Sequence, residues 1–147
     1  MKNNSKRQIT ITLLLIWISY MIFRGILKLF NLGKVELNKQ IFGTFAIVNY
    51  WIDALILLGF IAILILFIKR KWNTWRYIIG MTLFLILGTL FGQVLAFVMA
   101  DKFISVVGED LPRVFFLASS IITTIFLLLF YSLIIFWAYK NRRYFNR

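Results

Sequence analysis

Four long apolar runs divide the chain, and short polar segments separate them. The runs cover residues 9–30, 42–68, 77–100 and 114–139. An α-helix rises about 1.5 Å per residue, so each run is long enough as a helix to cross the roughly 30 Å hydrocarbon core of a bilayer. The pattern predicts an all-α integral membrane protein, with residues 1–147 forming a single domain of four transmembrane helices.

The first run reaches this length only if its polar end is helical. The uninterrupted apolar stretch, residues 9–23, has fifteen residues, too few to cross a bilayer. The helix is therefore expected to continue through Arg24 to Phe30, with Arg24 and Lys28 on one face. A basic head before an apolar body also fits a signal peptide. No small-residue cleavage site follows it, so we expect a retained helix.

The connectors between the runs are short, which favours an up-down-up-down bundle of antiparallel neighbours. Trp72, Trp75 and Tyr77 follow a basic cluster at residues 69–71, as in the aromatic belt at a membrane surface. The connector at residues 101–113 contains several apolar side chains. Part of it is expected to lie on the membrane surface.

Composition supports lipid as the solvent and excludes much chemistry. Hydrophobic residues make up 62% of the chain, whereas soluble domains contain about 45–50%. Cysteine and histidine are both absent, which removes disulfides, thiolate ligands and the usual proton shuttle at neutral pH. No phosphate-binding loop is evident. Asp53 and Asp101 are the candidates for a catalytic pair of carboxylates, but their predicted levels differ by about 12 Å. We therefore predict no enzymatic activity, no cofactor and no metal.

The basic residues are distributed unevenly between the two predicted sides of the membrane, and the net charge is +12. Both termini and the middle connector carry Lys2, Lys6, Arg7, Lys69, Arg70, Lys71, Arg76, Lys140, Arg142, Arg143 and Arg147. The other side carries Arg24, Lys28, Lys34, Lys39, Lys102 and Arg113. Eleven against six predicts cytoplasmic termini in a multi-pass plasma membrane protein, with inverted or dual topology as the alternative. The expected partners are the lipid bilayer with its anionic headgroups, and another membrane protein or further copies of the same chain, rather than nucleic acid.

A layer of polar side chains is predicted within the spans. Asp53 precedes fifteen uncharged residues, so it is expected to have a partner or a task. Counted as straight helices from the cytoplasmic ends, polar groups on all four spans lie at depths of about 22–24 Å. At this level lie Arg24, Asp53, Gln93, Thr123 and Thr124, and the predicted layer also includes Ser119, Ser120 and Asn49, which lie about one turn further out.

Arg24 and Asp53 are predicted to form an ion pair, with Gln93 and the hydroxyls as secondary partners, because an isolated charge in hydrocarbon is costly. The alternative is that each charge reaches water independently. Arg24 then extends to the headgroups, and Asp53 lies at the water boundary beside Asn49.

Small residues recur at every fourth position of the third run, at Gly88, Gly92, Ala96 and Ala100. Such a row allows a neighbouring helix backbone to approach closely. Glycine and alanine are also common in membrane helices, so a chance register is the alternative. We interpret the row as a packing face because Gln93 lies on nearly the same side.

Two classes of function remain open. The first is a small accessory subunit or immunity-type protein, which contacts another membrane protein and performs no chemistry. The second is a small oligomeric transporter or channel-like protein that uses Arg24, Asp53 and Gln93 as its site. A weaker alternative is a lipid-handling protein that gathers anionic headgroups.

Overall fold

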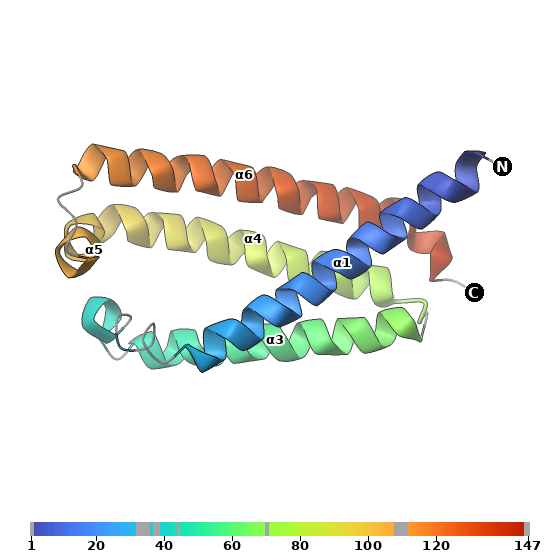
Figure 1. Ribbon diagram of the computed structural model, residues 1–147, viewed down its shortest axis with the longest axis horizontal. Helices are drawn as coiled ribbons and strands as arrows, with labels where there is room; N and C mark the ends of the chain where they lie inside the picture. The colour runs from blue at the N-terminus through green and yellow to red at the C-terminus, as the bar shows by residue number, and fades with distance from the viewer. Residues whose placement is uncertain are drawn as a thin grey trace.

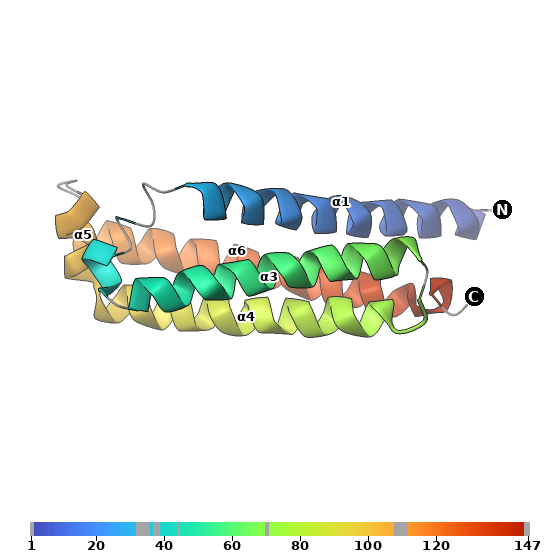
Figure 2. The same ribbon diagram turned by 90° about the horizontal axis from the view of Figure 1, so that it is seen from below.

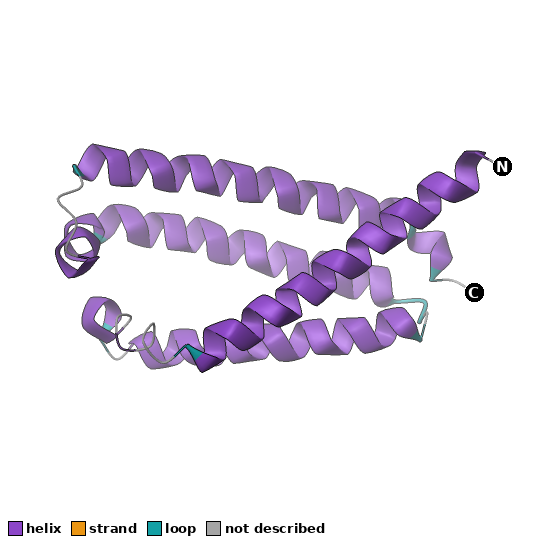
Figure 3. Cartoon of the chain, in the orientation of Figure 1, coloured by secondary structure: helices purple, strands orange, loops and turns teal. Residues whose placement is uncertain are grey.

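The computed structural model describes residues 2–31, 36, 39–43, 45–69, 71–107 and 112–145. Its helices are α1 (Lys2–Phe30), α3 (Phe45–Ile68), α4 (Thr74–Val98), α5 (Ala100–Val107), α6 (Arg113–Lys140) and the 3-10 turn η1 (Arg142–Tyr144). Within these ranges the chain contains helices and connections and no strand (Figure 3). Four of the helices, α1, α3, α4 and α6, are long and apolar enough to cross a membrane. The all-helical, four-span prediction is confirmed at this level.

Four helix ends differ by two or more residues from the predicted boundaries. α1 begins at Lys2, seven residues before the predicted span, and the other three differences are in α3 and α4. Gly43 has a φ of 58°, which glycine tolerates, and this turn makes α3 begin at Phe45 rather than at 42. α4 begins at Thr74 rather than at Tyr77, and the Thr74 hydroxyl lies 2.6 and 3.1 Å from the carbonyl oxygens of Lys71 and Leu66, to which it donates. α4 ends at Val98, so the last two residues of the predicted span lie outside it.

The four long helices follow one another around the bundle, and both ends of the chain lie at the same end (Figure 1). α1 crosses the other three obliquely, from beside the last turns of α6 to beside α3. α4 lies on the opposite side of the bundle from α1 (Figure 2). The closest helix pairs are α4 with α6 and α1 with α3. We call the end that contains Lys71, Arg76, Lys140 and Arg142 the basic end, and the other the α5 end.

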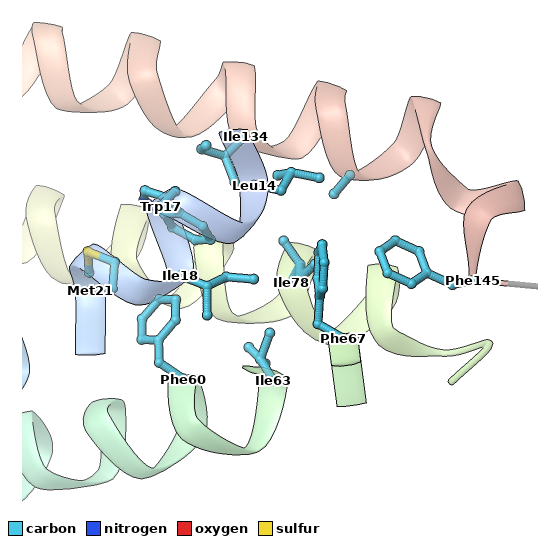
Figure 4. Packing of buried hydrophobic residues seen from close by; sticks show 11 residues of the cluster. Leu14, Trp17, Ile18, Met21, Phe60, Ile63, Phe67, Ile78, Ile134 and Phe145 are labelled. Carbon is cyan, nitrogen blue, oxygen red and sulfur yellow. The ribbon is translucent and has the colours of Figure 1, made fainter. Parts of the chain in front are cut away.

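The buried core lies toward the basic end, where α1 crosses its neighbours (Figure 4). Its members are apolar side chains from all four spans and the C-terminal turn: Leu14, Trp17, Ile18, Met21, Phe60, Ile63, Phe67, Ile78, Ile134, Ala138 and Phe145. The Trp17 and Phe60 rings meet edge to face with centroids 5.2 Å apart. No residue of α4 after Thr82, and none of α6 before Tyr131, is buried. The helices therefore share a core over only about half of their length.

The chain folds back after α6 and closes the basic end. The Phe145 ring is fully buried, 5.3 Å from the ring of Phe67 at the end of α3. Asn141 is also buried, and its Nδ2 donates to Thr10 Oγ1 at 3.0 Å and to the Trp137 carbonyl at 2.9 Å. A segment that the sequence indicates only as a basic tail thus joins α1, α3 and α6.

Aromatic contacts join the connectors at the α5 end. The Phe103 ring of α5 lies 5.5 Å from the Phe42 ring and 5.9 Å from that of Phe116 on α6. Asp101 and Arg113 form an exposed ion pair at 3.4 Å. The connector predicted to lie on the membrane surface contains a short helix that packs against both halves of the chain.

Candidate functional site

An ion pair joins the first two spans near the α5 end. Lys28 Nζ lies 2.8 Å from Asp53 Oδ1, and the two side chains are 41% and 22% exposed. The pair follows from the close approach of α1 and α3 at Gly25. A Cβ atom at Gly25 would lie 3.1 Å from Leu57 Cδ1, so only glycine fits without a shift of that side chain. One turn further toward the α5 end, Lys28 faces Asp53.

The predicted pair of Arg24 with Asp53 is wrong. Arg24 is exposed and forms no ion pair within the described chain. The depth count assumed that Ile9 and Ile68 lie at the same depth in the membrane. Because Lys28 pairs with Asp53 and the two helices are antiparallel, residue 13 is the one at the depth of Ile68. The error is four residues, about one helical turn. Arg24 lies on the same face of α1 as Lys28 but about 6 Å nearer the basic end, so the Asp53 carboxylate meets Lys28 instead.

Gln93 forms the second polar cluster, between α4 and α6. The hydroxyls of Ser120 and Thr124, one turn apart on α6, donate to Gln93 Oε1 at 2.8 and 2.7 Å. The structure thus brings Gln93 together with two of the hydroxyls that the depth count placed near it. Gln93 Nε2 is buried without a hydrogen-bond partner in the described part of the chain. A role in binding stays a prediction for all three residues.

The remaining members of the predicted layer are exposed. Ser119 and Thr123 donate to carbonyl oxygens of their own helix, at 2.9 and 2.8 Å, and so satisfy their hydroxyls locally. Asn49 is exposed on α3. No hydrogen bond or ion pair of the described residues links the Lys28–Asp53 pair to the Gln93 cluster. The polar residues therefore form two separate structural contacts, one in each of the closest helix pairs.

The glycines fall into two groups. Gly25 and Gly59 lie at close approaches, against Leu57 and Met81 respectively. In contrast, a Cβ atom added at Gly80, Gly88 or Gly92 on α4 would meet nothing within 4 Å.

The predicted row of small residues is therefore not occupied at its glycines by another helix of this chain. Ala96 is half-buried, and Ala100 is fully buried but belongs to α5, beyond the break at Met99. Packing of Gly88 and Gly92 against a helix from outside the chain stays a prediction.

Sequence reasoning missed three contributors: Lys28, Gly25 and Phe145. Lys28 follows Arg24 by four residues and so shares a helix face with it, and this spacing could have identified Lys28 as a second candidate partner for Asp53. Gly25 was visible as a small residue inside a span. Nothing in the sequence distinguishes Phe145 from the other aromatic residues near a basic tail. In the described ranges, no three carboxylate side chains lie together where they could hold a metal ion.

Comparisons with protein-family models, with curated proteins and with solved structures give no match. The class of the protein therefore rests on its own helices, which indicate a multi-pass membrane protein. The function proposed below rests on the contacts between these helices and on the helix surface that they leave exposed.

Proposed function

We propose that the chain is a non-enzymatic membrane protein that packs against a transmembrane helix of another protein, as an accessory subunit or immunity-type partner of a larger membrane complex. The observation that carries this proposal is the exposure of α4. Only 6% of its most apolar stretch is buried within the chain, against 28% in α1 and 17% in α3 and α6.

The uncovered face of α4 has the shape that helix packing requires. Gly80, Gly88 and Gly92 lie on one row of positions spaced by four or eight residues, and all three are exposed. Glycine in a helix interior costs about 1 kcal/mol relative to alanine. Close approach of a neighbouring helix offsets that cost. Within this chain, Gly25 and Gly59 accommodate side chains of neighbouring helices, Leu57 and Met81. A partner helix would pack against the three glycines of α4.

The polar clusters favour contacts over transport. A transport site needs polar groups that converge on a path through the membrane. Here Asp53 is paired with Lys28, Gln93 accepts from two hydroxyls of α6, and Arg24 is exposed. The alternative of a small transporter therefore loses the single site on which it was based.

The proposed orientation places the basic end in the cytoplasm. Both ends of the chain and the connector between α3 and α4 lie at this end (Figure 1). The sequence assigns eleven of the 17 Lys and Arg residues to these segments. Basic residues are retained on the cytoplasmic side during membrane insertion, which supports cytoplasmic termini and a plasma membrane location.

Purification from the native host in a mild detergent tests the proposed function. We expect a stoichiometric second membrane protein to copurify with the chain. The double variant Gly88→Leu/Gly92→Leu should reduce the copurified amount at least about tenfold, because a loss of about 1.4 kcal/mol in binding lowers the affinity by that factor.

Ala62→Leu is the matched control, since Ala62 is exposed on α3 and gains the same apolar side chain. It should leave the copurified amount unchanged. A chain that elutes alone, or only with a second copy of itself, contradicts the proposal.

A further inference from the structure

Cations and aromatic rings are interleaved where α4 begins and α6 ends. The Arg76 guanidinium lies over the rings of Trp72 and Trp75, at 5.2 and 5.3 Å from their centroids. The Arg142 guanidinium lies 4.4 Å from the centroid of Tyr139. Trp75 and Tyr139 also contact each other edge to face, with centroids 6.1 Å apart. The two arginines therefore flank one pair of touching rings from different helices.

These ring contacts orient the guanidinium groups and leave their donors unused. A guanidinium stacked on a ring still presents its N–H groups at its edge, where they match the oxygens of a phosphate. Arg76 and Arg142 are exposed, and neither guanidinium group forms an ion pair or hydrogen bond within the described part of the chain. Lys140 adds a third cation nearby, with Nζ 5.4 Å from the Phe136 ring.

The chain supplies no acidic side chain to neutralise this charge. The sequence contains no Asp or Glu in residues 54–100 or 111–147. Asp53 is fifteen residues before the end of α3, about 22 Å along the helix. Asp101 is on α5, beyond the end of α4, and that end is about 33 Å from Arg76 along the helix. Both separations exceed the Debye length of about 8 Å at physiological salt. The two guanidinium groups are therefore available to an anion from outside the chain.

The surroundings of the arginines match the headgroup region of a membrane. Trp72 and Tyr139 are 54% and 51% exposed, and such rings favour the membrane–water interface. Phe136 lies less than one turn inward from Tyr139 on α6 and is 55% exposed, so it offers apolar surface to an acyl chain. A free phosphate ion has no group to fill this apolar surface.

We propose that Arg76 and Arg142 together bind the phosphate of an anionic phospholipid headgroup, beside the ring pair Trp75–Tyr139. Lys140 contributes charge, and the apolar surface around Phe136 contacts the acyl chain. This site is separate from Gly88 and Gly92, which lie about 18 and 24 Å beyond Arg76 along α4. The proposal therefore does not depend on the partner helix proposed above.

Lipid retention measured by native mass spectrometry tests the site. The full chain is reconstituted in phosphatidylcholine nanodiscs with about one tenth phosphatidylglycerol and released into detergent, where bound lipids are counted. We expect the wild type to retain phosphatidylglycerol selectively. Arg76→Gln/Arg142→Gln should reduce this retention about tenfold, which corresponds to about 1.4 kcal/mol. Each single variant should show part of the loss, so the test stands if the double variant folds poorly.

Arg143→Gln is the control, because Arg143 is exposed beside Arg142, and removing it takes one charge from the same end. It should retain phosphatidylglycerol as the wild type does. Equal losses from Arg143→Gln and the single variants would show diffuse attraction to basic residues and overturn the site. Unchanged retention in the double variant would also overturn it. Displacement of the lipid by inorganic phosphate alone would identify a soluble anion as the ligand and contradict the assignment to lipid.

Discussion

Replacing Phe145 by alanine is expected to lower the free energy of unfolding by about 3–5 kcal/mol, the usual cost of removing a buried phenyl ring. Phe145 is fully buried although it follows α6 and η1, and its ring contacts those of Phe67 and Tyr144. Its removal leaves a cavity at the basic end, where all four spans share their core. The change also frees the last turn of the chain from α3.

Equilibrium unfolding in mixed micelles of detergent and sodium dodecyl sulfate measures this effect. Phe126→Ala is the matched control, because Phe126 is on α6 and is 69% exposed. Lipid or detergent covers that ring in both folded and unfolded helices, so its loss should change stability by less than about 1 kcal/mol. Equal effects of the two substitutions would show that Phe145 is not packed as described.

Removal of Lys28 is expected to destabilise the bundle by about 1–2 kcal/mol, because it leaves the Asp53 carboxylate unpaired inside a span. The full cost of an isolated charge at the bilayer centre is larger. Here Lys28 is 41% exposed and Asp53 is 22% exposed, so water reduces the effect. Lys28→Ala/Asp53→Ala should cost less than the sum of the two single changes.

A double-mutant cycle in the same unfolding assay isolates the pair. We expect a coupling energy of about 1 kcal/mol between Lys28 and Asp53. The matched cycle of Arg24 with Asp53 should give a coupling near zero, since Arg24 forms no ion pair within the described chain. Additive losses for Lys28 and Asp53 would disagree with the observed contact.

These two predictions mark the limits of what the sequence reveals. The lengths of the four apolar runs predict the four helices, because length and hydropathy decide whether a segment can span a bilayer. The depth count also placed Gln93 at the level of hydroxyls of the fourth span, and the structure brings it together with two of them. In that case α4 and α6 run side by side, so counting along straight helices gave the right register (Figure 1).

The same count failed for Arg24 because α1 crosses its neighbours obliquely. The ends of an oblique helix lie at different membrane depths from the ends of its neighbours. The apolar pattern of the sequence does not determine this difference in depth. The contact of Gly25 with Leu57 determines it instead, and it places Lys28 opposite Asp53. An error of one helical turn in the predicted depth therefore selected Arg24 instead of Lys28, which is on the same face of α1.

The C-terminal turn was not predictable for a different reason. Its position depends on two long-range contacts, Phe145 with Phe67 and Asn141 with Thr10. Neither contact produces a local pattern, since an aromatic residue among basic ones equally fits a membrane interface. Sequence therefore indicates which segments are helical more reliably than which segments meet.

Photo-crosslinking in native membranes tests the central claim most directly, namely that α4 presents its uncovered face to a helix of another protein. A photoreactive residue is placed at Leu87 or Phe91, which flank the glycine row and are 65% and 66% exposed. The matched control is Leu55 on α3, also 66% exposed. The account predicts one crosslinked product with a different membrane protein from the α4 positions and none from Leu55. Only lipid adducts, or a product between two copies of this chain, would contradict it.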